Sequence, residues 1–98
     1  MITIEQIKAL LGLQPLSLEG GFFVESYRSA EAIPGPALPA RYGGARAYGT
    51  AIYFLLTPDA CSTLHRLRTD EVWHFYLGDP VELLQLAPDG SGQIVLIG

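Results

Sequence analysis

The chain is built from short segments in which apolar and polar residues alternate, and turn sequences separate them at intervals of about ten residues. A period of two is that of a β-strand with one face against a core. Gly-Asp-Pro at 78–80 and Pro-Asp-Gly at 88–90 are turn sequences of this kind. The pattern predicts an antiparallel barrel or sandwich. The expected strands cover residues 22–28, 48–56, 62–67, 71–77, 81–86 and 93–97.

The first twelve residues follow a different period, which predicts one short amphipathic helix over 3–12. Thr3 with Gln6 three residues later is a capping-box pattern at its start. Gly12 is a suitable end, and Pro15 prevents the helix from continuing. The expected apolar face consists of Ile4, Ile7, Leu10 and Leu11.

Length and charge narrow the classes of function. Ninety-eight residues, 49% of them hydrophobic and 16% charged, predict a single folded domain over 1–98. A net charge of −4 with scattered arginines argues against nucleic-acid binding. No apolar run approaches the ~20 residues of a membrane span, and no secretory pattern opens the chain, so the expected location is cytoplasmic. Cys61 is the single cysteine and forms no internal disulfide.

Two stretches are expected to be irregular. Residues 29–47 contain several prolines and glycines and predict a long loop, of the kind that often forms a lid or a binding edge. Arg68-Thr69-Asp70 is interpreted as a three-residue hairpin loop between the strands 62–67 and 71–77. Residues paired across such a hairpin share a face, which puts His65 and Glu71 about 7–8 Å apart at Cα. The expected face holds His65, Leu67, Glu71, Trp73 and Phe75.

An imidazole and a carboxylate on one sheltered face support two kinds of chemistry. His65 and Glu71 can be two ligands of a divalent metal, or they can act as base and acid on a small substrate. Two ligands hold a metal weakly; Glu25 is a candidate third, and His74 would join only if a β-bulge near Val72 reversed the alternation. A structural role is also open, since a lone histidine on a strand is more often a hydrogen-bonded structural residue.

The segment that carries these residues fits the first sequence motif of the cupin superfamily, G-x5-H-x-H-x3-E-x6-G. His65, Glu71 and Gly78 occupy the first histidine, the glutamate and the last glycine. Leu67 stands at the second histidine, and Asp59 stands at the leading glycine. The resemblance therefore supports the barrel architecture, while the usual set of metal ligands is incomplete.

Two runs resemble one cupin family in particular, the predicted-cupin or cupin-five type of unassigned function. The run LEGGFFVESYRS at 18–29 is similar to that family's Glu-Gly-Gly turn and following aromatic strand. The second run, TAIYFLLTP at 50–58, leads into STLHRLRTDEVWHFYLGDPVEL at 62–83. The blocks occur in the family's order. Ser17 and Leu18 depart from it, because the family usually has His-Pro there.

The resemblance implies an all-β fold with one short N-terminal helix, namely an antiparallel cupin-type jelly roll, and a homodimer. Because the family continues beyond this chain's last expected strand, the barrel is expected to be incomplete. It also implies a small-molecule pocket of the kind that sugar epimerases use. His65 and Glu71 would be its catalytic or metal-binding residues. The ligand-binding positions would be Glu25, Tyr27, Arg28 and Trp73.

Three functions follow as alternatives. The first is an isomerase-like or epimerase-like activity on a sugar-like ligand, with or without a divalent metal. The second is a non-catalytic binding module, which Leu67 in place of the second histidine supports. The third is a dimeric assembly role, in which a second copy covers the apolar strand 93–97.

Overall fold

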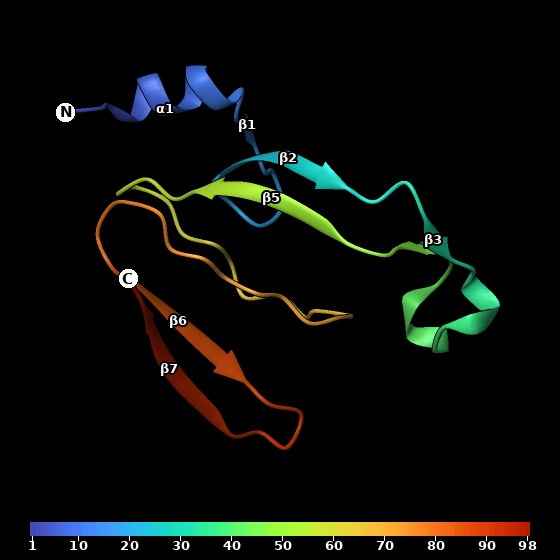
Figure 1. Ribbon diagram of the computed structural model, residues 1–98. Helices are drawn as coiled ribbons and strands as arrows, with labels where there is room; N and C mark the ends of the chain where they lie inside the picture. Colours follow the sequence, from blue (N-terminus) through green and yellow to red (C-terminus); the bar gives the residue numbers. More distant parts are fainter. The chain divides into compact units, whose positions relative to one another are not determined.

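The structure, a computed structural model, describes residues 1–98 and combines one short α-helix with antiparallel strands (Figure 1). The chain divides into two compact units, Met1–Arg68 and Thr69–Gly98, which are described separately. The mostly-β architecture with an N-terminal helix is confirmed. The strands form three separate antiparallel sheets and no closed barrel.

Helix α1 spans Ile4–Leu11 and has the ends that the sequence predicts. The Thr3 Oγ1 accepts a hydrogen bond from the Gln6 amide at 3.1 Å, and the Gln6 side chain accepts one from the Thr3 amide at 2.8 Å. This reciprocal capping box satisfies two amides that have no partner inside the helix. At the other end Gly12 takes a left-handed conformation with φ 68°. The Lys8 ammonium lies 3.8 Å from the centre of the Phe22 ring, so the helix contacts the sheet that follows.

The main sheet of the first unit has the order β1-β2-β5. Strands β2 (Phe22–Arg28) and β5 (Thr50–Leu55) pair antiparallel, and the predictions of strands at 22–28 and 48–56 are confirmed, the second with shorter ends. Strand β1 (Gln14–Pro15) is not predicted from the sequence, because Pro15 disfavours regular structure. An edge position explains it, since proline lacks only the amide that an edge strand leaves free.

The predicted long loop at 29–47 is closed by a short ladder of its own. Strands β3 (Ala32–Ile33) and β4 (Arg46–Ala47) pair antiparallel at its base. Between them lie two 3-10 turns, η1 (Gly35–Ala37) and η2 (Ala40–Tyr42). The ladder satisfies backbone groups at the base of the excursion, which Figure 1 shows in green beyond the ends of β2 and β5.

The second unit is built around a hairpin of β6 (Val81–Leu86) and β7 (Gly92–Ile97), which confirms the strands predicted at 81–86 and 93–97. Its turn is held by the carboxylate of Asp89, which accepts hydrogen bonds from the hydroxyl of Ser91 at 2.6 Å and from the Ser91 amide at 2.9 Å. Both bonds favour the ionised carboxylate, so they lower the pKa of Asp89 below its usual value.

This turn gives a pH-dependent prediction. A carboxyl whose pKa is lower in the folded protein stabilises the fold above its unfolded pKa, and the contribution is lost as the pH falls through the folded value. In Ser91→Ala the hydroxyl bond is gone, so the pKa of Asp89 is expected to rise towards its usual value, and the stability that this carboxyl contributes, and that acidification removes, is expected to become smaller. Carbon-detected NMR titration of the Asp89 carboxyl measures the change. An unchanged pKa in Ser91→Ala would show that the hydroxyl is not the cause.

The predictions of strands at 62–67 and 71–77 are wrong, because the structure has no regular elements between β5 and β6. A strand needs a continuous ladder with a neighbour. In the first segment the Thr63 amide instead donates to the Glu19 carbonyl, in the turn that precedes β2, at 2.7 Å. Residues 68–70 accordingly do not connect two regular strands.

Neither unit encloses a completely buried side chain. On the β6–β7 hairpin, one face carries four exposed apolar side chains, Leu84, Leu86, Ile94 and Leu96. The hydrophobic core is therefore thin, and much of the apolar surface lies on the faces of the sheets. No helix in the structure has the length and apolar character that crossing a membrane requires.

Candidate functional site

A β-bulge in β2 determines which side chains of the main sheet lie together. Glu25 pairs with Ile52 and Tyr27 pairs with Ala51, so Ser26 is an extra residue with no partner in β5. The Ser26 hydroxyl donates to the Ala51 carbonyl at 3.2 Å. Such a bulge lets the ladder continue in register while the strand gains one residue.

The bulge changes the faces of the residues that follow it. In a regular strand Glu25 and Arg28, three positions apart, would lie on opposite faces. Here Glu25 is opposite Ile52, and Arg28 is opposite Thr50. Ile52 and Thr50 are two positions apart in β5 and therefore share a face. Because paired residues lie on the same face, Glu25 and Arg28 do so as well. We call this the Glu25 face. Its members are Phe23, Glu25, Arg28, Thr50, Ile52 and Phe54.

Tyr27 lies on the opposite face, which it shares with Phe22 and with Tyr53 of β5. Helix α1 contacts that face through Lys8 and Phe22. Of the three ligand-binding residues predicted on β2, the structure therefore brings Glu25 and Arg28 together and separates Tyr27 from them.

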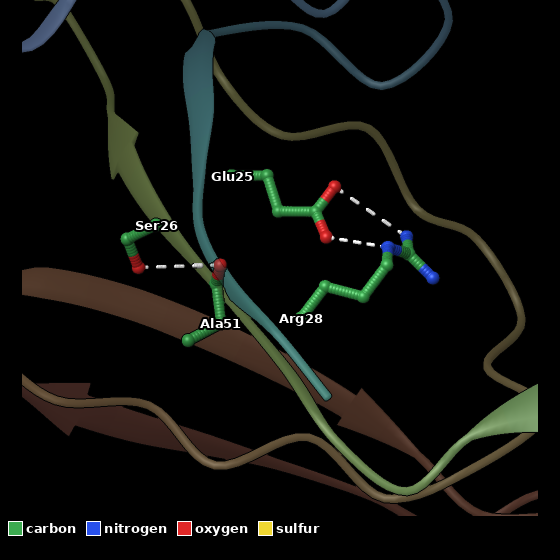
Figure 2. A network of polar contacts seen from close by, with 4 residues as sticks. All are labelled: Glu25, Ser26, Arg28 and Ala51. Carbon is green, nitrogen blue, oxygen red and sulfur yellow. Dashed lines mark hydrogen bonds and ion pairs between the residues drawn. The ribbon is translucent and has the colours of Figure 1, made fainter. Parts of the chain in front are cut away.

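Glu25 and Arg28 form a two-point ion pair (Figure 2). The Arg28 Nε donates to Glu25 Oε1 at 2.6 Å, and Nη2 lies 3.4 Å from Oε2. The Arg28 side chain is 61% exposed and the Glu25 side chain 39%, so water screens the pair and its contribution to stability is small. Its consequence is geometric, because Glu25 holds one edge of the guanidinium and the Nη1 amino group has no protein partner.

A second group of polar contacts lies where the turn between β1 and β2 meets the segment after β5. The turn closes on itself through hydrogen bonds from the Leu16 amide to the Gly21 carbonyl and from the Gly20 amide to the Leu16 carbonyl. Thr63 fixes it to the later segment, since its amide donates to the Glu19 carbonyl at 2.7 Å. The Thr63 hydroxyl lies 3.2 Å from the Leu18 carbonyl and 3.3 Å from that of Glu19.

Gly20 makes this contact between the two segments possible. Its φ is 92°, a conformation that residues with a side chain rarely adopt. A Cβ at this position would lie only 2.2 Å from the carbonyl oxygen of Cys61. The Glu-Gly-Gly sequence therefore allows the turn to approach the backbone of 61–63 more closely than any other residue at position 20 would permit.

His65 is oriented by the same segment. Its Nδ1 lies 2.7 Å from the carbonyl oxygen of Thr63, and because a carbonyl only accepts hydrogen bonds, Nδ1 carries the proton. In the neutral ring Nε2 is then unprotonated, with a lone pair available to a proton or a ligand. Nε2 lies 3.7 Å from the Glu19 carboxylate, and the two side chains are 33% and 41% exposed.

The other predicted site residues belong to the second unit. Glu71 and Trp73 lie in the irregular segment before β6, as does His74. His65 belongs to the first unit, so the pairing of His65 with Glu71 stays a prediction. Within the first unit, the carboxylate that faces His65 is Glu19.

The residues do not fit the divalent metal that the cupin-type motif implies. Leu67 occupies the position of the second histidine, and a leucine offers no donor atom. No group of three or more histidine, cysteine or carboxylate side chains is gathered closely enough to hold an ion.

Glu19 and Thr63 are the residues that sequence reasoning missed. The Glu-Gly-Gly run was identified as a turn, but nothing in a one-dimensional pattern shows which distant segment a turn contacts. Two adjacent glycines directly before a strand were the available signal, because they permit close backbone approach.

Two surface hollows lie outside this group of polar contacts. One of about 580 Å³ lies beside α1 and is lined by Met1, Ile2 and Gln6 among others, and one of about 370 Å³ lies at the β6–β7 turn.

Comparison with known proteins gives a family assignment. A search of curated proteins finds no match. A family model described as Cupin superfamily (DUF985) matches residues 5–98, which include the Glu-Gly-Gly turn, the bulged strand and both histidines. Because the match extends over nearly the whole chain, the protein belongs to this family of the cupin superfamily.

Proposed function

We propose that this cupin-family protein binds a small, polar, sugar-like molecule that carries an acidic group, and that it does so on the Glu25 face. The observation that supports this most directly is the bulge at Ser26, which puts Glu25 and Arg28 on one face beside the apolar side chains of Phe23 and Phe54. A few fixed polar groups beside apolar walls are typical of small-molecule sites.

The Glu25–Arg28 pair suggests how such a ligand is recognised. Glu25 fixes the Nε edge of the guanidinium, and Nη1 remains free to donate to a carboxylate or phosphate. An arginine held in this way loses less conformational freedom on binding than a free side chain does. The free carboxylate edge of Glu25 can accept hydrogen bonds from hydroxyl groups of the same ligand.

In an isomerase-like form of this function, His65 is the base and Glu71 the acid. The Nε2 of His65 is unprotonated in the neutral ring and can accept a proton. Glu71 would return a proton, and Trp73 would provide an aromatic wall. Leu67, in place of the second histidine of the motif, supports the alternative, a binding module without catalysis.

Binding is tested with a sugar acid as the probe. Isothermal titration calorimetry with glucuronate is expected to show binding, and glucose, which lacks the carboxylate, is expected to bind more weakly. In Arg28→Gln the affinity for glucuronate is expected to fall about tenfold or more, because hydrogen bonds to charged groups contribute about 1.5–3 kcal/mol. In Arg66→Gln, which removes an arginine with no described side-chain partner, the affinity should stay unchanged. Equal losses in both variants would indicate non-specific attraction of anions and contradict the proposal.

A dimeric assembly role is the second candidate. The exposed apolar face of the β6–β7 hairpin supports it, since a second copy that covered Leu84, Ile94 and Leu96 would remove apolar surface from water. Sedimentation velocity across a tenfold range of concentration tests this role. A single monomeric species throughout that range would contradict it.

A further inference from the structure

We propose that the protein has a second anion site at the loop 29–47, in which Arg41, Arg46 and Arg68 bind the phosphate group of a small soluble molecule. We call these three residues the arginine cluster. They are scattered along the sequence, but the fold gathers them around Tyr42 and the residue that follows it. All of them belong to the first unit. The site uses none of the residues of the proposed function, so neither depends on the other.

Two of the guanidinium groups lie beside the ring of Tyr42. The carbon at the centre of the Arg41 group is 4.8 Å from the ring centroid, and that of the Arg46 group is 5.7 Å from it. Both distances are within the range of cation–π attraction, which offsets part of the repulsion between the two like charges. The ring is half-buried, so it gives the two arginines a common support.

Hydrogen bonds to backbone carbonyls fix the arginines further. The Nε of Arg41 donates to the Arg68 carbonyl at 3.2 Å. The Nη2 of Arg46 donates to the Tyr42 carbonyl at 2.9 Å. The guanidinium of Arg68 lies close by, because a Cβ added to Gly43 would be 3.8 Å from its Nη1. Each bond uses one nitrogen, so both Nη groups of Arg41 and the Nε and Nη1 of Arg46 remain to donate to an anion.

No carboxylate neutralises the arginine cluster. No aspartate or glutamate oxygen lies within 4.0 Å of a nitrogen of its side chains, and the ion pairs of the chain involve Lys8, Arg28 and His65 instead. Glu31, the carboxylate of the loop itself, takes part in none of them. In a chain with a net charge of −4, three uncompensated positive charges at one place create a local field that attracts anions.

The chemistry of the arginine cluster favours a phosphate group over a carboxylate. A phosphate monoester carries a charge of about −1.5 to −2 at neutral pH and three strong acceptor oxygens, whereas a carboxylate has one charge and two oxygens. Arginine forks also match phosphate oxygens in two-point hydrogen bonds. A lipid headgroup fits less well, because no large apolar side chain that could enter a bilayer is exposed within 29–47.

The experiment is isothermal titration calorimetry of the full chain with glycerol 3-phosphate, in a phosphate-free buffer of low ionic strength. The matched variants are Arg68→Gln and Arg66→Gln, which remove the same charge two positions apart. Neither side chain forms a hydrogen bond or an ion pair in the structure, so neither change removes a contact that the fold needs. The affinity is expected to fall about tenfold in Arg68→Gln and to stay unchanged in Arg66→Gln.

Two comparisons separate this site from that of the proposed function. Binding of glycerol 3-phosphate should persist in Arg28→Gln, and binding of glucuronate should persist in Arg68→Gln. Equal losses of phosphate affinity in Arg68→Gln and Arg66→Gln would indicate diffuse attraction of anions and overturn the inference. A loss in Arg28→Gln alone would place the phosphate on the Glu25 face and overturn it as well. Loss of glucuronate binding alone would contradict only the proposed function.

Vesicles that contain phosphatidic acid distinguish a lipid from a soluble ligand, because this lipid carries the same glycerol phosphate group. The protein is expected to bind glycerol 3-phosphate and to remain in the supernatant when such vesicles are sedimented. Sedimentation with the vesicles, without binding of the soluble compound, would overturn the inference. NMR checks the position: the Arg41 Nε–H signal should shift when glycerol 3-phosphate is added, and an unchanged signal at saturation would show that the ligand binds elsewhere.

Discussion

Replacing Gly20 by alanine is expected to lower the free energy of unfolding of the first unit by about 3 kcal/mol or more. Two costs add at this position. A residue with a side chain at φ 92° is strained by about 1–2 kcal/mol, and its Cβ would lie 2.2 Å from the Cys61 carbonyl oxygen. Because that obstacle is backbone, no side-chain rotation relieves it, and the turn must move away from residues 61–63.

Gly90 provides a matched control. Its φ of 89° is almost the same as that of Gly20, but a Cβ there would meet nothing within 4 Å. Gly90→Ala therefore measures the conformational strain without the clash, about 1–2 kcal/mol. Urea denaturation followed by circular dichroism gives both values, and hydrogen exchange of the Thr63 amide reports whether the turn remains in contact. Equal destabilisation in the two variants would show that the approach to Cys61 is not required.

The second large effect concerns the bulge. Inserting one threonine between Ala51 and Ile52 gives Ser26 a partner in β5 and makes the ladder regular. Glu25 and Arg28 would then lie on opposite faces, because three positions of a regular strand separate them. The ion pair at 2.6 Å would be lost, and the affinity for glucuronate is expected to fall about tenfold or more although Arg28 is still present.

Deleting Ser26 is the matched control for this insertion. It also removes the bulge, but it leaves Glu25 and Arg28 two positions apart in a regular strand and therefore on the same face. Binding of glucuronate should persist in this variant, and the hydrogen-bonded Arg28 Nε–H should stay visible by NMR. If the insertion retained the Nε–H signal and the affinity, the bulge would not be what places Arg28.

Several local features could be predicted from the sequence because each depends on neighbouring residues. The helix with its Thr3–Gln6 capping box, the strand Phe22–Arg28 and the hairpin after Gly78 all follow from periodicity and turn chemistry. The cupin motif around His65 and the Glu-Gly-Gly run also pointed to the family that the comparison confirms. These signals are local in the chain, so no knowledge of distant contacts was needed.

The wrong or missing predictions concern features that depend on contacts between segments far apart in the chain. The segment around His65 has the alternation of a strand, yet the Thr63 amide bonds to the turn at Glu19, which is 44 residues away. The face of Arg28 depends on the count of residues in β5, which the sequence of β2 does not contain. Pairing across long separations is decided by tertiary contacts, and a single shift reverses every following side chain.

The sequence by itself determined the family, the helix, four of the predicted strands and the candidate status of His65, Glu25 and Arg28. The tertiary structure alone decided that Arg28 lies beside Glu25, that Tyr27 lies on the opposite face of the sheet, and that Glu19 is the carboxylate nearest His65 in the first unit. The physical reason is that residue types and their periods are written along the chain, whereas a bulge and a close backbone approach exist only between segments that meet in space.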